Sequence, residues 1–193
     1  MMCISPRADL PDLLSALRDY RPKTLPRADH RGSAILVPIL AKGRGRLLYT
    51  LRNRNLKHHA GQFSFPGGVV EKGESGWQAA VREANEEVGL PRDHVRYLGR
   101  LDDVLSPRGF HVQCYAGLVS PFAIAPNQSE VERVIEVELA ELFEPQRHEV
   151  KDWKGFPVHF FSFSLGLVWG VTGKITYQLQ QTLRDEESRP LVK

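Results

Sequence analysis

The sequence predicts an α/β fold, an α/β/α sandwich with a mixed β-sheet, on three observations. Short apolar runs typical of strands recur along most of the 193 residues. Helical periodicity marks three main segments, near the start, in the middle and at the end of the chain. An apolar content of 41% in a chain of this length is enough to bury one core, so no second domain is needed.

The first elements are a helix and two strands. Residues 10–20 carry leucines at helical spacing, and a linker rich in proline and arginine follows to about residue 32. Residues 33–40 and 46–52 are apolar runs separated by the turn-like sequence AKGRG, which predicts a β-hairpin. We therefore divide the chain into an N-terminal helix and linker, residues 1–32, packed on a domain of residues 33–193 that includes the C-terminal helix.

A central helix follows a short strand expected at residues 63–65. Ser75 is expected to cap this helix and to form a capping box with Gln78, while Gly89 ends it. At about 100° per residue, Glu83, Glu86 and Glu87 share one arc. The apolar side chains fall on a separate stripe, formed by Trp77, Ala80, Val81, Ala84 and Val88. The pattern predicts one packed face and one carboxylate face.

The second half of the chain alternates strands with helices. Strands are predicted at residues 95–101, 110–119, 131–137 and 157–163. A short helix is predicted at residues 139–143, and a closing helix at residues 168–184. Strands flanked by helices in this order are what the sandwich requires.

The carboxylates of the central helix indicate a metal site. Glu83 and Glu87 are like charges four residues apart, which costs a few tenths of a kcal/mol, on the order of 0.3, in an isolated helix. Arg82 lies four residues before Glu86 and is expected to pair with it, leaving Glu83 and Glu87 free to offer oxygen ligands to Mg²⁺ or Mn²⁺. A solvated acidic face is the ordinary alternative, but the fixed spacing of glycines, arginine and carboxylates favours the metal.

This spacing carries a resemblance. Residues 68–90, GVVEKGESGWQAAVREANEEVGL, match the Nudix box pattern G-x5-E-x7-R-E-U-x-E-E-x-G-U, where U is bulky or aliphatic. The chain thus resembles Nudix hydrolases, which cleave nucleoside diphosphates linked to another moiety, and the resemblance implies the Nudix-type α/β/α sandwich. It also implies that Glu74 fixes the loop by hydrogen bonding.

The family pattern implies roles for the other box residues. Glu83 and Glu87 are the expected direct metal ligands, together with the main-chain carbonyl of Gly67. Glu86 is expected to ligate a second ion or to hold a metal-bound water, and Arg82 is expected to orient it. These residues form the expected catalytic and metal-binding set.

A second resemblance lies upstream of the box. Residues 47–68, LLYTLRNRNLKHHAGQFSFPGG, resemble the additional signature of coenzyme A pyrophosphatases within the Nudix family. Residues 98–112 and 168–172 are also similar to that subfamily. Two positions depart from it, Asn53 in place of the usual serine and Gln113–Cys114 in place of a common threonine–proline pair, and these bear on substrate preference. The matching residues are Thr50, Arg52, Leu56, His59, Gly61, Gln62, Phe65, Pro66, Gly67 and Gly68.

The same segment supplies the expected substrate-binding residues. A cluster of basic side chains just upstream of the box suits the phosphates of a 3′-phosphorylated ADP group. A solvated basic loop, with His59 capping backbone groups, is the ordinary alternative for such a cluster. The expected set is Arg52, Arg54, Lys57, His59 and Gln62.

The function implied is metal-dependent hydrolysis of the diphosphate of coenzyme A or its derivatives to 3′,5′-ADP and 4′-phosphopantetheine, or its acyl form. One alternative is a housecleaning Nudix hydrolase of oxidised nucleoside triphosphates or nucleotide sugars. Another is a non-catalytic nucleotide-sensing module. The general base is either a box glutamate or a distant carboxylate, with Glu130 as the distant candidate and Glu132 as its substitute.

Composition limits the partners. The net charge of +3 without a long basic run does not call for a nucleic acid, so a small anionic substrate is expected. The N-terminus lacks a signal-peptide pattern and no stretch is apolar enough to span a bilayer, so we expect a cytoplasmic protein without a membrane partner. Cys3 and Cys114 show neither disulfide-framework nor zinc spacing. A homodimer is also a candidate, in which Trp169 and Gly170 would contact the second subunit.

Overall fold

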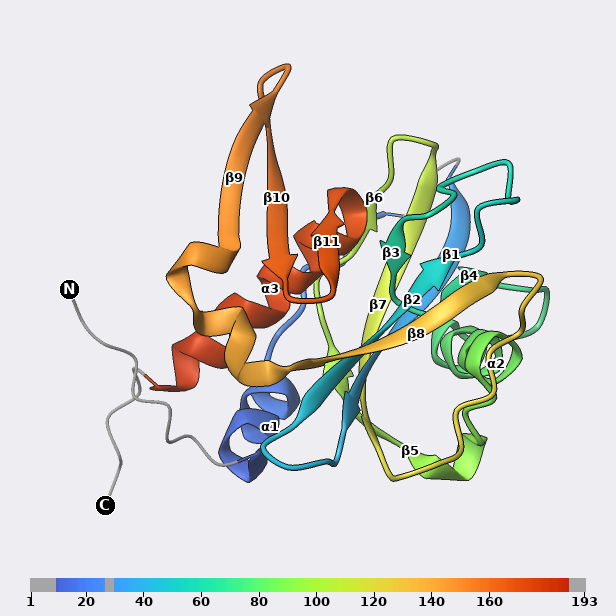
Figure 1. The fold of residues 1–193 in the computed structure, drawn as a ribbon, viewed down its shortest axis with the longest axis horizontal. Coiled ribbons are helices and arrows are strands. Elements are labelled where there is room, and N and C mark those ends of the chain that lie inside the picture. Colours follow the sequence, from blue (N-terminus) through green and yellow to red (C-terminus); the bar gives the residue numbers. More distant parts are fainter. Residues whose placement is uncertain (1–9, 27–29, 188–193) are drawn as a thin grey trace.

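The computed structural model describes residues 10–26 and 30–187, which form two β-sheets with helices on both sides of the larger one (Figure 1). The described residues leave out 1–9 and 27–29 of the predicted N-terminal segment and 188–193 of the predicted domain. Cys3 lies in the first of these ranges.

The larger sheet is mixed, as predicted. Its central strand β1 (Arg31–Leu40) runs parallel to β7 (Phe110–Val119) and antiparallel to β2 (Arg46–Arg52). The strand order is β3-β2-β1-β7-β5, with β3 at Phe63–Ser64 and β5 at Val95–Arg100. Three further strands join this path: β4 (Gly67–Val69) pairs with β1, β6 (Val104–Leu105) with β7, and β8 (Val131–Glu138) with β2.

The predicted hairpin of β1 and β2 is confirmed only next to its turn. The two strands pair at Ile39–Leu47 and Leu40–Arg46. Beyond this point they take different partners: β2 pairs with β3 and β8, whereas β1 pairs with β4. The segment from β3 to β4 therefore passes from β2 to β1 and brings the glycines of β4 to the start of the central strand.

Two apolar cores lie on opposite faces of this sheet. Side chains of β1 alternate between them, as expected for a strand buried on both faces. Ala34 and Leu36 pack with the buried side of α2 (Gly76–Val88), whereas Val37 and Ile39 pack with side chains of α1 (Leu10–Asp19) and α3 (Gly170–Glu187). Figure 1 shows α2 on one side of the sheet and α1 and α3 on the other. The predicted sandwich is confirmed.

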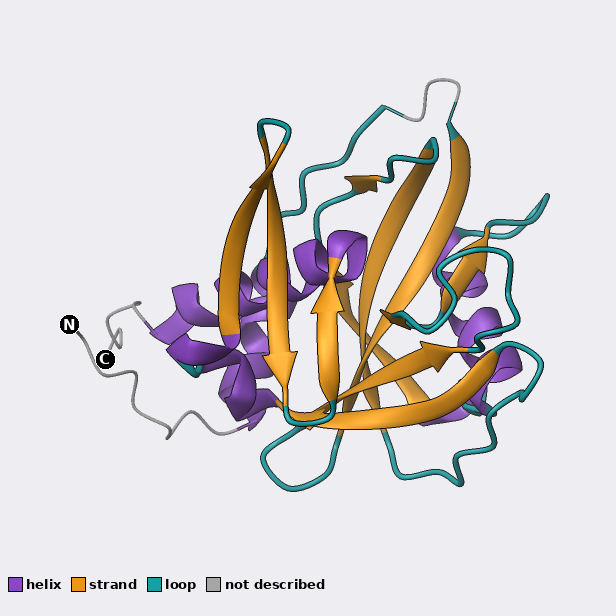
Figure 2. Cartoon of the chain, turned by 45° about the horizontal axis from the view of Figure 1, so that its top comes forward, coloured by secondary structure: helices purple, strands orange, loops and turns teal. Residues whose placement is uncertain are grey.

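A second, three-stranded antiparallel sheet is formed by β9 (His148–Trp153), β10 (Phe156–Phe163) and β11 (Gly166–Trp169). In the view of Figure 1 the hairpin of β9 and β10 projects beyond the other elements, and Figure 2 shows these strands beside those of the larger sheet. On the inner face of the hairpin His148 and His159 stack with each other and with Tyr177 of α3.

The closing helix predicted at residues 168–184 begins later than expected. Val168 and Trp169 belong to β11, where they pair with Phe161 and Phe160, and α3 starts at Gly170. A β-branched and an aromatic side chain favour a strand once a partner strand is present, and helical periodicity alone does not report that partner. The prediction was wrong for these two residues.

The N-terminal segment packs on the larger sheet. Leu14 and Leu17 of α1 are buried, and the chain after α1 is held by two aspartates. Asp102 accepts hydrogen bonds from the Tyr20 hydroxyl (2.8 Å) and the Lys23 amide (2.7 Å), while Asp103 accepts one from the Leu25 amide (3.0 Å).

Three short 3₁₀ helices complete the described elements. The predicted short helix is η2 (Leu139–Phe143), and η1 (Arg92–His94) and η3 (Pro145–Arg147) were not predicted. Within the described residues, no helix is long and apolar enough to cross a membrane.

Replacing Gly99 with alanine is expected to destabilise the fold. A Cβ atom at Gly99 would lie 2.0 Å from the Leu17 carbonyl oxygen, so α1 would have to move away from β5. We expect a loss of about 1–3 kcal/mol in the free energy of unfolding, measured by urea denaturation. Arg96→Ala, at an exposed position of the same strand, should change it by less than about 0.5 kcal/mol. Equal stabilities for the two variants would contradict the close packing of α1.

Candidate active site

The helix that carries the candidate site starts and stops as its sequence predicts. The Gln78 amide donates to the Ser75 hydroxyl oxygen (3.3 Å), and the Ser75 amide donates to the Gln78 side-chain oxygen (2.8 Å), which completes the capping box. Gly89 adopts a left-handed conformation with φ of 73° and ends the helix. The apolar stripe is buried against the sheet at Ala80, Val81, Ala84 and Val88.

The carboxylate face is not uniformly exposed. Glu87, on the predicted carboxylate face, is only 2% exposed, so this face is partly buried and not simply solvated. Its position three residues after the buried Ala84 places it at the edge of the packed face. A backbone hydrogen bond from Gly67 reaches its carboxylate, whereas its Oε2 atom is buried without a hydrogen-bond partner.

Burial dominates the electrostatics of these groups. It raises the pKa of Glu87 to about 8, although the positive charge of Arg52 and the Gly67 hydrogen bond lower this pKa. Burial also raises the pKa of Glu83, against the opposing effect of Arg82. The negative charge of Glu130 adds to both increases, so the three carboxyl groups lie close enough to repel one another. A bound cation would relieve that repulsion.

Arg82 lies among three glutamates. Its Nε and Nη2 atoms donate to the two carboxylate oxygens of Glu74 (3.1 and 3.0 Å), and Nη1 donates to Glu83 (2.9 Å) and to Glu86 (3.0 Å). Nη2 also donates to the Val69 carbonyl (3.1 Å). The predicted pairing with Glu86 is confirmed. The expectation that Glu83 would be left free was wrong, because one of its oxygens accepts from the same guanidinium group.

The loop before the helix depends on glycine at two positions. A Cβ atom at Gly67 would lie 2.4 Å from the Ala34 carbonyl oxygen, and one at Gly68 would lie 2.3 Å from the Glu83 carboxylate. Only a residue without a side chain lets this backbone approach both β1 and Glu83. Glu74 further fixes the loop, as expected, by accepting a hydrogen bond from the Glu71 amide (2.9 Å).

The residues of this site fit a hard divalent cation. In the described ranges, no three histidine, cysteine or acidic side chains converge as a ready-made metal site, and Glu83 and Glu86 each give an oxygen to Arg82. The buried Oε2 of Glu87, however, has no hydrogen-bond partner. The Glu87 carboxylate lies beside the glycine loop, where a Cβ atom at Gly67 or Gly68 would clash with its neighbours. Carboxylate and carbonyl oxygens are the donors that Mg²⁺ and Mn²⁺ prefer. Glu83, Glu86, Glu87 and the Gly67 carbonyl remain the proposed ligands.

The loop before β8 brings Glu130 to the site. The amides of Ala125 and Asn127 donate to the carbonyls of Val88 (3.0 Å) and Glu87 (2.9 Å) at the end of α2. The Asn127 side chain donates to Oε1 of Glu130 (3.3 Å). Asn127 was missed by the sequence reasoning, which considered only carboxylates in this turn.

Two basic residues at the end of β2 take different positions. Arg52 lies near Glu87, whose pKa its charge lowers, and its Nε atom is buried without a hydrogen-bond partner. Arg54 instead pairs with Glu132 through Nε (3.2 Å). This pairing occupies Glu132, the substitute candidate for the general base.

The remaining predicted substrate-binding residues lie on the loop between β2 and β3. The side chains of His59 and Gln62 form a hydrogen bond (2.8 Å), and the loop closes through the Gly61 amide, which donates to the Arg52 carbonyl (3.1 Å). Lys57 is exposed on this loop. The structure therefore brings Arg52 to the carboxylates but does not gather all five predicted residues around one point.

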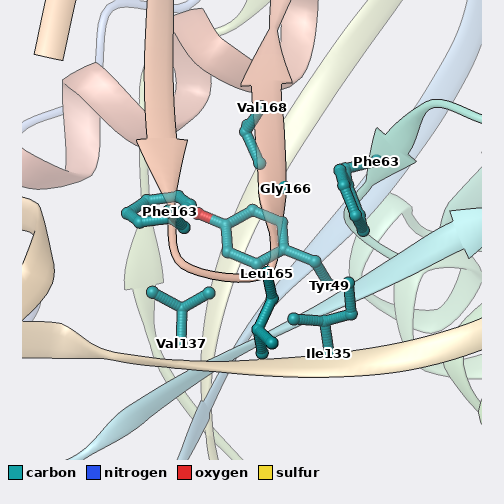
Figure 3. A pocket seen from close by; sticks show the side chains of 8 residues that line it. All are labelled: Tyr49, Phe63, Ile135, Val137, Phe163, Leu165, Gly166 and Val168. Atoms are coloured by element: carbon teal, nitrogen blue, oxygen red, sulfur yellow. The ribbon is translucent and has the colours of Figure 1, made fainter. Parts of the chain in front are cut away.

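A separate apolar slot lies between the two sheets (Figure 3). Phe63 of β3, next in sequence to Gln62, forms one wall of this slot. None of the box carboxylates lines it, and its walls offer no charged group for a phosphate. The complete lining is Tyr49, Phe63, Ile135, Val137, Phe163, Leu165, Gly166 and Val168.

Comparison with known proteins gives a consistent result. The NUDIX domain family matches residues 30–170. A protein of Photorhabdus laumondii named uncharacterized Nudix hydrolase NudL is 36% identical over 162 residues, which cover 81% of this chain and 87% of its own. The protein of that name in Escherichia coli is 33% identical over 183 residues, covering 88% and 92%. Among solved structures, the Nudix hydrolase RenU from M. smegmatis shares the fold, with a TM-score of 0.56, 19% identity, and coverage of 85% and 90%.

Without divalent metal, thermal stability should fall as the pH rises from about 5 to about 8. The folded protein keeps a proton on Glu87 up to its pKa of about 8, whereas the unfolded chain releases it near the ordinary value for glutamate. Stability from this group is therefore complete below the unfolded pKa and is lost as the pH rises through the folded pKa. Glu87→Gln cannot ionise and should remove much of this slope, measured as melting temperature in EDTA.

The control for this experiment is Glu86→Gln, at an exposed position of the same helix, which should keep the wild-type slope. Adding Mg²⁺ or Mn²⁺ near pH 8 should raise the melting temperature of the wild type and not that of Glu87→Gln. A Glu87→Gln profile parallel to the wild type would show that the buried carboxyl does not govern this pH dependence.

Proposed function

This chain belongs to the Nudix hydrolase family, and on that premise we propose that it hydrolyses the diphosphate linkage of coenzyme A or its derivatives. Members of the family act on small nucleotide substrates and generally use a divalent metal such as Mg²⁺ or Mn²⁺. The proposed products are 3′,5′-ADP and 4′-phosphopantetheine, or its acyl form.

One observation supports this substrate above others. In the folded chain, the upstream segment lies next to the box carboxylates, and this is the segment that resembles the coenzyme A pyrophosphatase signature. Its Arg52 lies near the buried Glu87. Its neighbour Asn53 donates through its amide to the Glu130 carbonyl (2.8 Å) and through its side chain to the Gln128 carbonyl (2.7 Å). The signature, the box and the loop of the candidate base therefore meet at one place.

The chemistry follows from the charges at this place. Divalent ions, when bound, would offset the charge of the diphosphate and supply an activated water. The oxygen of water forms a bond to one phosphorus atom while the bridging P–O bond breaks, and the proton of the water has to be removed.

Each proposed residue has one task in this reaction. Glu130, held through Oε1 by Asn127, is the proposed acceptor of the water proton. The guanidinium group of Arg52 offers positive charge to the phosphates. Arg82 keeps Glu83 and Glu86 in place at hydrogen-bond distance.

Purified protein with Mg²⁺ or Mn²⁺ should convert coenzyme A to 3′,5′-ADP and 4′-phosphopantetheine, identified by mass spectrometry. Glu87→Gln removes a proposed metal ligand and should reduce the rate by a factor of about 100 or more. A panel of nucleotide sugars and oxidised nucleoside triphosphates is run in parallel. Turnover of one of these without cleavage of coenzyme A would refute the substrate and keep the family chemistry. Binding of a nucleotide without any product would refute catalysis.

Glu130→Gln should reduce kcat by roughly 10²–10⁴-fold, because an amide cannot accept the proton of the attacking water. Metal affinity, measured by calorimetry, should stay close to that of the wild type. Glu138→Gln, at the far end of β8, the strand that follows Glu130, serves as the matched control. Loss of turnover in Glu132→Gln together with full activity in Glu130→Gln would assign the base to Glu132 instead.

A further inference from the structure

The outer face of the three-stranded sheet carries a group of apolar side chains. Strand register places Trp153 opposite Phe156, and Phe160 opposite Trp169. Paired residues of antiparallel strands point to the same side, and alternation along each strand puts these four on the side away from α3. We call this the outer face, formed by Trp153, Phe156, Val158, Phe160, Leu167 and Trp169, together with Glu149 and Lys151.

These apolar side chains are more exposed than is usual on the surface of a monomeric protein. Trp153 is 69% exposed and Phe156 is 72% exposed at the tip of the projecting hairpin, and Leu167 and Trp169 are 44% and 43% exposed below it. Phe160 and Trp169 stack with their ring planes 6° apart and their centroids 6.1 Å apart. Contiguous apolar surface of this kind marks an interaction site. No other described segment covers it.

The charges of the outer face are complementary to those of the same face on a second copy of the chain. Glu149 and Lys151 lie two residues apart on β9, both exposed, and pair with each other at 3.1 Å. The face therefore carries one charge of each sign and no net charge. In a two-fold contact the surface meets its own copy, so Lys151 of one protomer can face the glutamate of the other. A surface of anionic lipid would instead be matched by an excess of basic residues.

We propose that a second copy of this chain docks on the outer face, in a two-fold contact that brings the three-stranded sheets of two protomers together. Aromatic side chains cover about 150–250 Å² each, so the exposed parts of the six apolar residues amount to roughly 500 Å² per protomer. Two such faces bury about 1,000 Å² in total, which is where specific interfaces begin. Trp169 was the subunit contact predicted from the sequence, and the proposed contact extends from it over the hairpin of β9 and β10.

Sedimentation velocity over a range of protein concentrations tests this contact. The wild type should sediment as a dimer, and Trp153→Ser/Phe156→Ser should raise the dimer dissociation constant by roughly 100-fold. Both side chains are largely exposed, so the variant should fold, which circular dichroism and the melting temperature verify. The matched control is Leu105→Ser/Ile124→Ser, two exposed apolar residues away from this sheet, which should dimerise like the wild type.

Charge reversal tests the pairing across the two-fold axis. Glu149→Lys and Lys151→Glu should each weaken dimerisation by about tenfold, and combining them should restore it. A wild type that stays monomeric at every concentration, or a dimer that persists in Trp153→Ser/Phe156→Ser, would overturn the proposal. Monomeric protein that binds vesicles of phosphatidylcholine and phosphatidylglycerol through Trp153 would assign the face to lipid instead. A combined reversal that fails to restore the dimer would overturn the pairing of these charges.

Discussion

The candidate site depends on one guanidinium group that holds several negative charges together. Arg82 donates to three glutamates and to the Val69 carbonyl, so it joins the loop before α2 to the helix itself. Glu74 and Glu83 belong to different parts of the chain and would repel each other without it. The hydrogen bond from Arg82 is the largest cause that lowers the pKa of Glu74, so this carboxylate stays ionised beside its neighbours. Arg82 therefore ties the loop to the helix.

At the candidate site the fold brings together four segments that are distant in sequence. The end of β2 supplies Arg52, the glycine loop supplies Gly67 and Gly68, α2 supplies the glutamates, and the loop before β8 supplies Glu130. They meet because β1 and β2 part soon after their turn, and the chain between β3 and β4 passes from one strand to the other. The divergence of the hairpin thus creates the space that the site occupies.

The features that could be predicted from the sequence are those set by near neighbours. The capping box of Ser75 and Gln78, the stop at Gly89 and the apolar stripe of α2 all rest on residues within a few turns of each other. The features that could not be predicted depend on distant contacts. Strands β4, β9 and β11 are short or polar and become recognisable only through their partners. The burial of Glu87 depends on how closely a glycine backbone approaches the helix, which no spacing along the chain reports.

The hydrogen bonds from Ala125 and Asn127 to the end of α2 have a consequence for changes of chain length in this protein. They fasten the turn that carries Glu130 to the terminal carbonyls of the helix, so local contacts with α2 help to set the position of Glu130. Insertions in the loops of the intervening region, which runs through β5 and β7, are therefore expected to leave the position of Glu130 relative to α2 unchanged. A change of even one residue between Asn127 and Glu130, by contrast, would move the carboxylate relative to the helix. The chain is therefore expected to tolerate a longer segment between α2 and this turn better than a change of length within the turn itself.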